Sequence, residues 1–267
     1  MKRRDFIKTS LTASALAGVA QANLSASAAE AGNATNLDYY ELRAYRLKPG
    51  ANHDLLDGYL EKAAIPTFNR LGVKTVGVFT EPEAKDGPAV WVLIPYPSLE
   101  LFSTAVARLN ADADYQKAGE KYLQVMKEQA AFDRIDSWLL LAFSGMPRLE
   151  VPALTREKKA RIFEMRTYES YSEVKALKKV DMFNAGEIDV MKEVNLSPVF
   201  YGQALIGRDL PHLTYMLCGE NKDAHKKHFG DFGKHPTWNK LKNDPQYGDT
   251  VSKITSRFFE PTAFSQI

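Results

Sequence analysis

The sequence predicts an α+β protein in which two ferredoxin-like units, each with the element order β-α-β-β-α-β, pack sheet to sheet as a barrel-like pair. The first observation is a repeat: residues 40–45 (Tyr-Glu-Leu-Arg-Ala-Tyr) recur as residues 163–168 (Phe-Glu-Met-Arg-Thr-Tyr). The second is periodicity, because both copies alternate between the two-residue period of strands and the 3.6-residue period of helices. A single sheet of this kind needs cover beyond its two helices, and a second copy can supply it.

The N-terminus has the composition of an export signal. Residues 1–8 are charged, residues 11–20 are small and apolar, and Ala-x-Ala cleavage sites end at Ala22 and Ala28. The beginning resembles the twin-arginine motif, which is carried here by Arg3, Arg4, Phe6 and Lys8. We expect residues 1–28 to be a signal peptide that engages the twin-arginine translocase, with a periplasmic or extracellular destination. An ordinary amphipathic helix is the alternative, and residues 29–37 are expected to form a flexible lead-in.

The first repeat is expected to span residues 38–144. Alternating hydrophobicity predicts strands at 38–47, 73–79, 89–94 and 135–143. Helical periodicity predicts helices at 55–69 and 99–127, the second interrupted near 110–114.

A linker and the second repeat follow. Residues 145–160 contain Gly145, Pro147, Pro152 and a charged run, which is typical of a loop between domains. The second repeat, 161–267, is expected to contain strands at 161–169, 198–206, 212–218 and 253–260, and helices at 173–193 and 222–243. The repeat offset of residues 40–45 also aligns Tyr115 with Trp238, whereas aligning 142–144 with 263–265 requires a two-residue gap.

These residues resemble the NIPSNAP family. The resemblance is carried by residues 40–45, by their counterpart 163–168, and by the His-Pro-Thr-Trp stretch at 235–238. It implies the dimeric α/β-barrel fold, here as two fused halves, and it implies little about activity. The first copy has Ala-Asp-Tyr at 113–115 where the second has Pro-Thr-Trp at 236–238, so we do not expect the halves to be equivalent.

The opening strand of each repeat suggests a site. Because side chains alternate along a strand, the Glu-Arg-Tyr set of each copy shares one face. We expect the apolar alternates to lie under the helices and the charged sets to lie between the two sheets. There they would form ion pairs that fix the docking of the halves, or line a cavity for a small acidic or phenolic ligand. The candidate ligand-binding residues are Glu41, Arg43, Tyr45, Glu164, Arg166, Tyr168, Tyr201, His235 and Trp238.

Three of the five histidines, His225, His228 and His235, lie close together. On one continuous helix they would share a face suited to zinc, iron or haem. Gly230 and Gly233 argue against continuity, and no acidic ligand completes a site, so His225 and His228 are only weak metal candidates. A basic, mostly exposed face is the alternative. The sequence itself requires no cofactor, and His53 and His212 are expected in solvated turns.

Composition excludes several classes of function. The net charge is +2, and the signal segment carries more basic than acidic residues, so no basic surface for nucleic acid is expected. The single cysteine, Cys218, excludes an internal disulfide. No apolar run reaches the roughly 18 residues of a membrane helix.

The sequence therefore predicts an exported protein that binds a small organic ligand between its two repeats, of a chemistry that stays open. Two alternatives remain. One is a non-catalytic assembly module, which could form homo-oligomers. The other, by fold analogy, is a small oxygenase- or isomerase-like enzyme. Unpaired Arg and Tyr groups around a cavity would favour ligand binding, and mutually paired Glu and Arg groups without a void would favour assembly.

Overall fold

The computed structural model describes residues 36–48 and 53–267. The predicted export signal, its cleavage sites and most of the predicted lead-in therefore lie outside the described residues. Within the described ranges, no helix is both long and apolar enough to cross a membrane.

The first repeat has the predicted element order. Its strands are β1 (Tyr39–Leu47), β2 (Gly77–Thr80), β3 (Ala89–Tyr96) and β4 (Phe132–Ala142). The helix predicted at 55–69 is α1 (Asp54–Tyr59), a π-helical turn η2 (Leu60–Ala64) and α2 (Ile65–Arg70) in succession. The second helical region is α3 (Leu99–Ala111), α4 (Ala113–Leu123) and the 3₁₀ turn η3 (Lys127–Gln129). The break between α3 and α4 lies where it was predicted, because the Asp112 carboxylate accepts a hydrogen bond from the Tyr115 backbone and starts α4 there.

The second repeat has the same order. Its strands are β5 (Ile162–Glu169), β6 (Pro198–Ile206), β7 (His212–Gly219) and β8 (Lys253–Pro261). Its helices are α6 (Glu173–Met182), the π turn η4 (Phe183–Glu187), α7 (Ile188–Glu193), α8 (Lys222–Lys234), α9 (Pro236–Lys242) and the 3₁₀ turn η5 (Pro245–Tyr247). The linker contains a short helix, α5 (Ala153–Arg156), which the Pro and Gly content did not predict.

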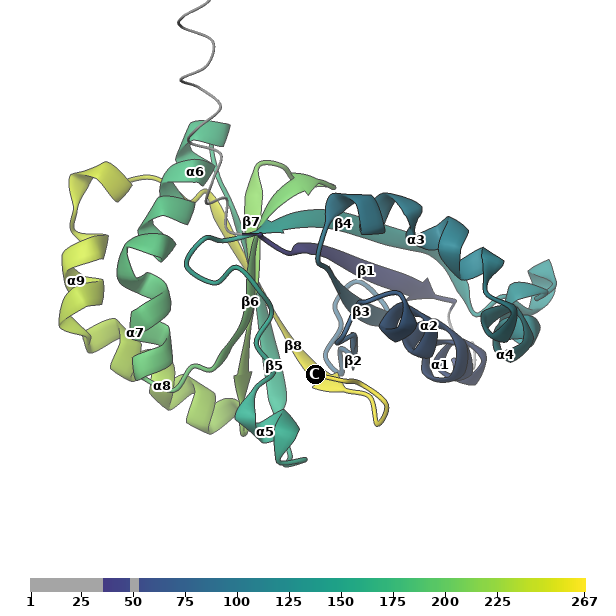
Figure 1. Ribbon diagram of the computed structural model, residues 1–267. Helices are drawn as coiled ribbons and strands as arrows, with labels where there is room; N and C mark the ends of the chain where they lie inside the picture. The colour runs from purple at the N-terminus through teal and green to yellow at the C-terminus, as the bar shows by residue number, and fades with distance from the viewer. Residues whose placement is uncertain (1–35, 49–52) are drawn as a thin grey trace, which may run out of the picture. The chain divides into compact units, whose positions relative to one another are not determined.

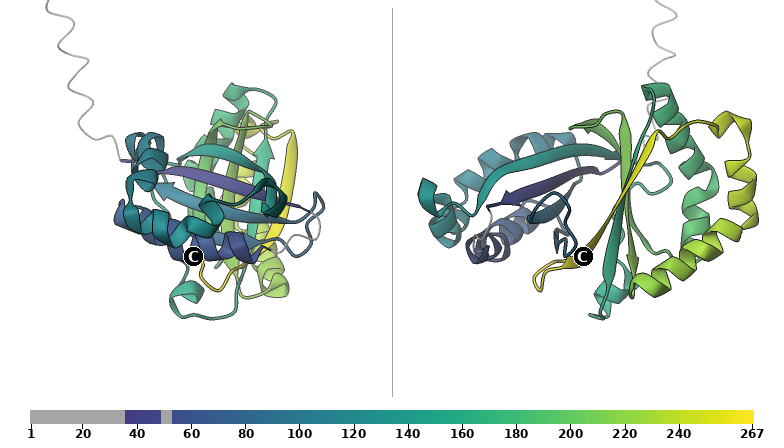
Figure 2. Two further views of the ribbon diagram at one scale, coloured as in Figure 1. Left: turned by 90° about the vertical axis from the view of Figure 1, so that its right-hand side faces the viewer. Right: turned by 180° about the vertical axis from the view of Figure 1, so that it is seen from behind.

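The strands close into one barrel in the order β1-β3-β2-β8-β5-β7-β6-β4. Each repeat contributes four adjacent strands, and all neighbouring pairs are antiparallel. The repeats meet at two seams, β2 with β8 and β4 with β6. The helices of each repeat cover the outside of its own strands, on opposite sides of the barrel (Figures 1 and 2). A closed barrel leaves no strand edge unpaired.

The strand register corrects one sequence alignment. Ser137 on β4 lies opposite Arg43 of β1, and Ser256 on β8 lies opposite Arg166 of β5. Ser137 is therefore equivalent to Ser256, and the alignment of 142–144 with 263–265, which needed a gap of two residues, is wrong in this strand. The equivalence has a chemical basis, since each serine hydroxyl donates a hydrogen bond to the glutamate of its own repeat, Glu41 or Glu164.

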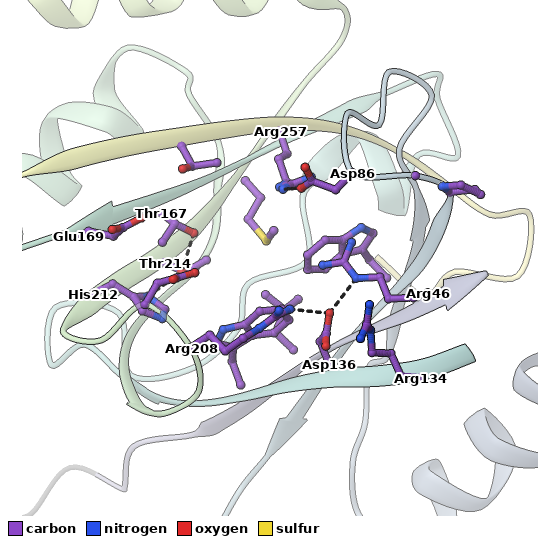
Figure 3. A pocket seen from close by; sticks show the side chains of 18 of the residues that line it. Arg46, Asp86, Arg134, Asp136, Thr167, Glu169, Arg208, His212, Thr214 and Arg257 are labelled. Carbon is purple, nitrogen blue, oxygen red and sulfur yellow. Dashed lines mark hydrogen bonds and ion pairs between the residues drawn. The ribbon is translucent and has the colours of Figure 1, made fainter. Parts of the chain in front are cut away.

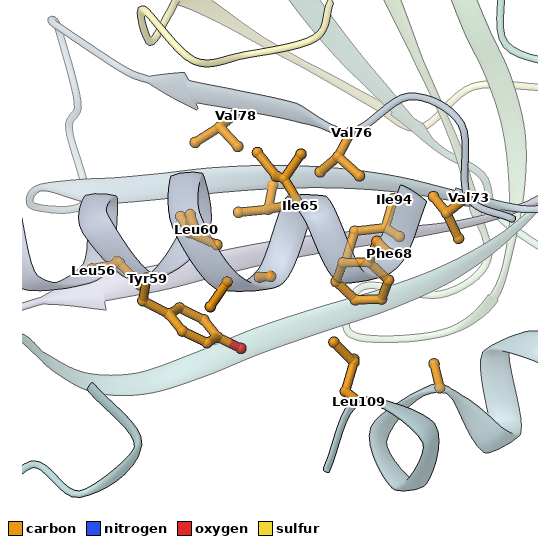
Figure 4. Close-up of a cluster of buried hydrophobic side chains, with 14 of the residues drawn as sticks. Leu56, Tyr59, Leu60, Ile65, Phe68, Val73, Val76, Val78, Ile94 and Leu109 are labelled. Atoms are coloured by element: carbon orange, nitrogen blue, oxygen red, sulfur yellow. The ribbon is translucent and has the colours of Figure 1, made fainter. Parts of the chain in front are cut away.

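Both faces of the sheet are buried, and this overturns the predicted direction of the opening strands. The inner face packs apolar and aromatic side chains inside the barrel, among them Tyr40, Leu42, Ala44, Phe163 and Met165. The outer face packs under the helices in what we call the helix layer. In the first repeat, α1, η2 and α2 place Leu56, Leu60, Ile65 and Phe68 against Val78 and Ile94 of the sheet and against Val76, which precedes β2 (Figure 4).

The Glu-Arg-Tyr sets therefore point into the helix layers and not into the space between the sheets. The closed wall of strands shields the barrel interior at the level of Glu41 and Arg43, whereas the helix layer is open to water at its margins, and Arg43 keeps 18% of its side chain exposed there. Charges are less costly to place where they reach water. The apolar alternates consequently fill the barrel.

Candidate functional site

One end of the barrel holds an open cavity of about 580 Å³, which we call the barrel-mouth cavity. It lies where β1 and β5 end and where the β2–β3 and β6–β7 loops come together, so both repeats line it (Figure 3). The opposite end is filled by the apolar side chains of Leu37, Leu149, Leu154 and Ile267, which pack onto the barrel core. The residues that line the barrel-mouth cavity are Leu42, Arg46, Leu47, Asp86, Gly87, Pro88, Trp91, Asp133, Arg134, Asp136, Trp138, Met165, Thr167, Glu169, Arg208, Asp209, His212, Thr214, Lys253, Thr255 and Arg257.

The floor of the cavity is apolar. Leu42 and Met165 reach it as inward-facing residues of the two opening strands. Trp91 of β3 and Trp138 of β4 stack with ring centroids 5.8 Å apart and planes inclined by 16°. Trp91 is only 4% exposed, and the guanidinium groups of Arg46 and Arg257 lie over its ring, so the pair forms an aromatic base beneath the charged rim.

The rim is charged. Asp136 of β4 accepts ion pairs from Arg46 of β1 at 2.7 Å and from Arg208 of the β6–β7 loop at 2.6 Å. Partial burial would raise the pKa of Asp136, but the hydrogen bond from Arg46 and the charges of Arg208, Arg46 and Arg134 hold it below its ordinary value. On the other side, Arg257 pairs with Glu81 and Asp86.

The wall opposite the tryptophans carries hydroxyl groups. The Thr167 and Thr214 hydroxyl oxygens are 2.9 Å apart, and the Thr214 oxygen is 3.4 Å from Nδ1 of His212. His212 is only 3% exposed and begins β7, so its predicted place in a solvated turn is wrong. Burial lowers the pKa of His212. The other histidine predicted in a turn, His53, keeps 45% of its side chain exposed and pairs with Asp57.

In the first repeat, the predicted site residues form a closed network in the helix layer. Arg43 donates from Nε and Nη2 to the two carboxylate oxygens of Glu41, at 2.6 and 2.7 Å. The hydroxyls of Tyr96 and Ser137 donate to the same carboxylate at 3.0 Å each. Tyr45 is buried among the apolar residues of that layer. Glu41 and Arg43 are thus paired within one repeat and do not fix the docking of the two halves, as the sequence analysis had left open. The void beside Arg43 and Tyr45 has a volume of about 10 Å³.

The second repeat varies the same network. Arg166 donates to Glu164 at 2.6 Å, and Nε2 of His225 lies 2.8 Å from the other carboxylate oxygen. The ring of His225 packs against Gly219, the counterpart of Tyr96, so it replaces the tyrosine of the first repeat. Burial would raise the pKa of Glu164, but the His225 hydrogen bond and the Arg166 charge lower it overall. The Tyr168 hydroxyl lies 2.9 Å from that of Tyr215.

The remaining candidate ligand-binding residues also lie away from the barrel-mouth cavity. Tyr201 is fully buried, and its hydroxyl donates to the Met191 sulfur. Trp238 packs on Phe232 in the helix layer, with ring centroids 4.6 Å apart. His235 starts α9 by accepting from the Thr237 backbone. The expectation that these residues line a cavity between the sheets is thus wrong.

The histidine cluster does not come together as a metal site. Helix α8 continues through Gly230 and Gly233 to Lys234, so the expected break at the glycines is wrong and the helix ends just before His235. His225 is held by Glu164, and His228 lies one turn further along α8. Over the described ranges, no group of three or more His, Cys, Asp and Glu side chains could hold a metal ion.

One buried ion pair was missed by the sequence analysis. Lys179 of α6 and Glu187 of η4 are 2.7 Å apart, with 5% and 2% of their side chains exposed. Burial raises the pKa of Glu187 although Lys179 opposes this. The π turns of the two repeats are equivalent in position, so the first repeat carries Leu56 and Ala64 at these places.

The cavity residues were missed as well, although a signal for them existed. The inward-facing series of β1 runs Tyr40, Leu42, Ala44 and ends on Arg46, and that of β5 ends on Glu169. An apolar series that ends on a charge indicates the point where the interior opens to water.

Comparison with known proteins places these observations in a family and a fold. The family model described as NIPSNAP matches residues 40–139 and 163–266. A monooxygenase-like protein from Fusobacterium nucleatum has a TM-score of 0.52 at 8% identity, over 85% of this chain and 93% of its own. Another from Lactobacillus acidophilus has a TM-score of 0.53 at 8% identity, over 84% of this chain and 94% of its own. A NIPSNAP family protein from Agrobacterium tumefaciens has a TM-score of 0.36 at 18% identity, over 40% of this chain and 98% of its own. Comparison with curated proteins finds no match.

Proposed function

This chain belongs to the NIPSNAP family, with two copies of the domain, and from this premise we propose that it binds a small organic ligand in the barrel-mouth cavity. The observation that carries the proposal is the asymmetry of the barrel. One end is filled with apolar side chains, whereas the other is open over an apolar floor with a charged rim. A concave, partly apolar space with a few polar groups is the usual form of a small-molecule site.

The proposal requires both repeats in one barrel. The tryptophan floor and Arg46 come from the first repeat, and Arg208 and the threonine wall come from the second. We propose to class each repeat, 38–144 and 161–267, as a ferredoxin-like unit. No specific observation favours the assembly or enzyme alternatives, since the monooxygenase-like neighbours share the fold at 8% identity.

We also propose that the protein acts after export. Support comes from the sequence alone, through Arg3, Arg4, Phe6 and Lys8, which lie outside the described residues. A fusion to a reporter that is active only in the periplasm should lose its signal when Arg3 and Arg4 are changed to lysine. Retained export of that variant would refute this part of the proposal.

The ligand proposal can be tested with the three tryptophans, whose indole N–H groups give separate NMR signals. On titration with 2-naphthamide, the signals of Trp91 and Trp138 should shift, because both line the cavity. Trp238 lies in the helix layer of the second repeat and serves as the internal control. Single Trp→Phe variants assign the signals.

A blocking variant completes the test. Thr255→Trp fills the cavity from β8 and should abolish the shifts of Trp91 and Trp138. Ile254→Trp is the matched control, because Ile254 is the preceding residue, half-exposed and outside the cavity lining. Absence of any shift with 2-naphthamide and 2-naphthoate alike, or equal shifts in all three tryptophans, would refute the proposed site.

A further inference from the structure

Building on the proposed function, we infer that the ligand is a flat organic acid whose anionic group binds between Arg46, Arg134 and Arg208, the arginine cluster. The three guanidinium groups surround the single carboxylate of Asp136 at the rim of the barrel-mouth cavity (Figure 3). The anionic end of the ligand would therefore lie at the rim.

The first two members are placed against electrostatic preference. Arg46 of β1 and Arg134 of β4 are direct partners in the strand register, and both line the cavity. Like charges directly opposite each other on paired strands are destabilising. Arg46 has an ion pair with Asp136, but Arg134 makes no hydrogen bond or ion pair with any residue in 36–48 or 53–267. Arg134 acts on Asp136 only through its charge, so its exposed guanidinium keeps its hydrogen-bond donors available to an anion.

The third member is brought by the other repeat. Gly207, just before Arg208, has a φ of 149°, and a Cβ there would overlap the ring of Trp138. Glycine thus allows the β6–β7 loop to lie directly on the tryptophan floor. Arg208, with 61% of its side chain exposed, pairs with Asp136 and lies over the Trp138 ring at 5.7 Å. The loop fixes this charge beside the other two.

Apart from Asp136, the other charged groups that line the cavity form no ion pair with the cluster in the described ranges. Arg257 is held by Glu81 and Asp86, and Lys253 by Glu169 at 2.7 Å. Asp133 and Asp209 also line the rim, and within the described ranges neither forms an ion pair with the cluster. Asp136 therefore forms ion pairs with Arg46 and Arg208, and a carboxylate from the ligand would complement Arg134 beside them. The planar fork of arginine suits that group.

The tryptophan floor indicates the chemistry of the remainder of the ligand. The stacked rings of Trp91 and Trp138 lie beneath the cluster, since the Arg46 guanidinium is 5.4 Å from the centre of Trp91. A ligand with its acid at the cluster would place its body against the edges of these rings that the guanidinium groups leave uncovered. An aromatic or conjugated carboxylic acid combines both features.

The test compares 2-naphthoate with 2-naphthamide, two probes of nearly equal shape that differ in charge, by isothermal titration calorimetry at low salt. The native protein should bind the acid at least about tenfold more tightly, because a hydrogen bond to a charged group is worth a factor of that order. Arg134→Gln should weaken the affinity for 2-naphthoate by about tenfold and change the affinity for 2-naphthamide by less than about twofold. Arg134 is exposed and unpaired in the described chain, so the variant should fold, which its thermal midpoint verifies.

Lys253→Gln is the matched control. Lys253 lines the same rim on the equivalent strand, opposite Glu169 as Arg134 is opposite Arg46, and carries the same charge, but it is already paired. It should leave both affinities within about twofold. If Lys253→Gln weakens the affinity for 2-naphthoate as much as Arg134→Gln does, the acid responds to the general positive potential of the rim, and the assignment of its site to the arginine cluster is wrong. Equal binding of acid and amide by the native protein would overturn the inference while leaving the proposed site intact, whereas binding of neither probe would overturn the proposed function.

Discussion

The buried ion pair Lys179–Glu187 should be replaceable as a pair but not one residue at a time. The first repeat supplies the replacement, since Leu56 and Ala64 occupy the same positions around its own π turn and are fully buried. The perturbations are Lys179→Leu, Glu187→Ala and the two together. Removing one partner of a buried pair leaves an uncompensated charge, whereas replacing both by apolar residues is often close to neutral.

The structure sets the size of each effect. In Glu187→Ala, the Lys179 ammonium still faces the rings of Phe183 at 4.6 Å and Trp238 at 5.4 Å, so the loss should fall at the low end of the usual range, about 3 kcal/mol. In Lys179→Leu, the isolated Glu187 carboxyl takes up a proton. Against an unfolded pKa near 4.3, keeping it protonated at about pH 7.5 costs about 4 kcal/mol. The double variant should lie within about 2 kcal/mol of the native protein.

The pH dependence gives a second check. A carboxyl whose folded pKa is raised above the unfolded value loses stability as the pH rises above the unfolded pKa, and this loss vanishes below it. The deficit of Lys179→Leu should therefore shrink to about 1 kcal/mol at about pH 5. Urea unfolding of the four proteins at both pH values measures these differences. If the single losses add in the double variant, or if the deficit of Lys179→Leu is the same at both pH values, the reasoning is wrong.

Three further predictions concern the cavity. Gly207→Ala should lower the free energy of unfolding in urea by about 2–4 kcal/mol, because the added Cβ meets Trp138. Gly87→Ala, at a φ of 84° with open space around it, should lower it by about 1 kcal/mol, and equal losses would mean that only backbone strain matters. Burial lowers the folded pKa of His212, so its contribution to stability is present above about pH 6.5 and lost on acidification. The His212→Gln variant should therefore lose less stability between about pH 7 and 5 than the native protein, and parallel pH profiles of the free energy of unfolding would contradict this. Arg134→Gln should raise the free energy of unfolding by about 0.5 kcal/mol at low salt, an increase that disappears in about 1 M salt, and a destabilised variant would show that the arginine holds the strand.

The sequence predicted the element order and the barrel because these depend on local periodicity and on repetition. Strand β6 was predicted at the bounds it has, 198–206, since its hydrophobic run ends in the turn around Gly207. The direction of the opening strands could not be predicted in the same way. Both faces of β1 are largely covered, since Glu41 in the helix layer is buried like Leu42 in the barrel and Arg43 keeps only 18% of its side chain exposed. Alternation identifies which residues share a face of the strand, but it does not show whether that face packs under the helices or inside the barrel.

The site was harder to predict than the fold because its residues are distant in sequence. Asp136 and Arg208 meet only because β4 and β6 form a seam between the repeats. Arg208 is also placed by a loop whose backbone has positive φ values at Gly207 and Asp209, and Gly207 lies too close to the Trp138 ring to carry a side chain. Hydrophobic periodicity reports burial, and it gives no information about loops that cross from one repeat to the other.

Fusion of the two repeats has a consequence for stoichiometry. In a barrel made from two identical chains, every side chain at the mouth would appear twice, and a single ligand would have two equivalent orientations. Here, the position of Trp91 corresponds to Thr214 in the second repeat, and that of Trp138 to Arg257, so the two walls of the cavity differ. A titration should therefore saturate at one ligand per chain, bound in one orientation, and each wall is free to accept substitutions without imposing the same change on the other.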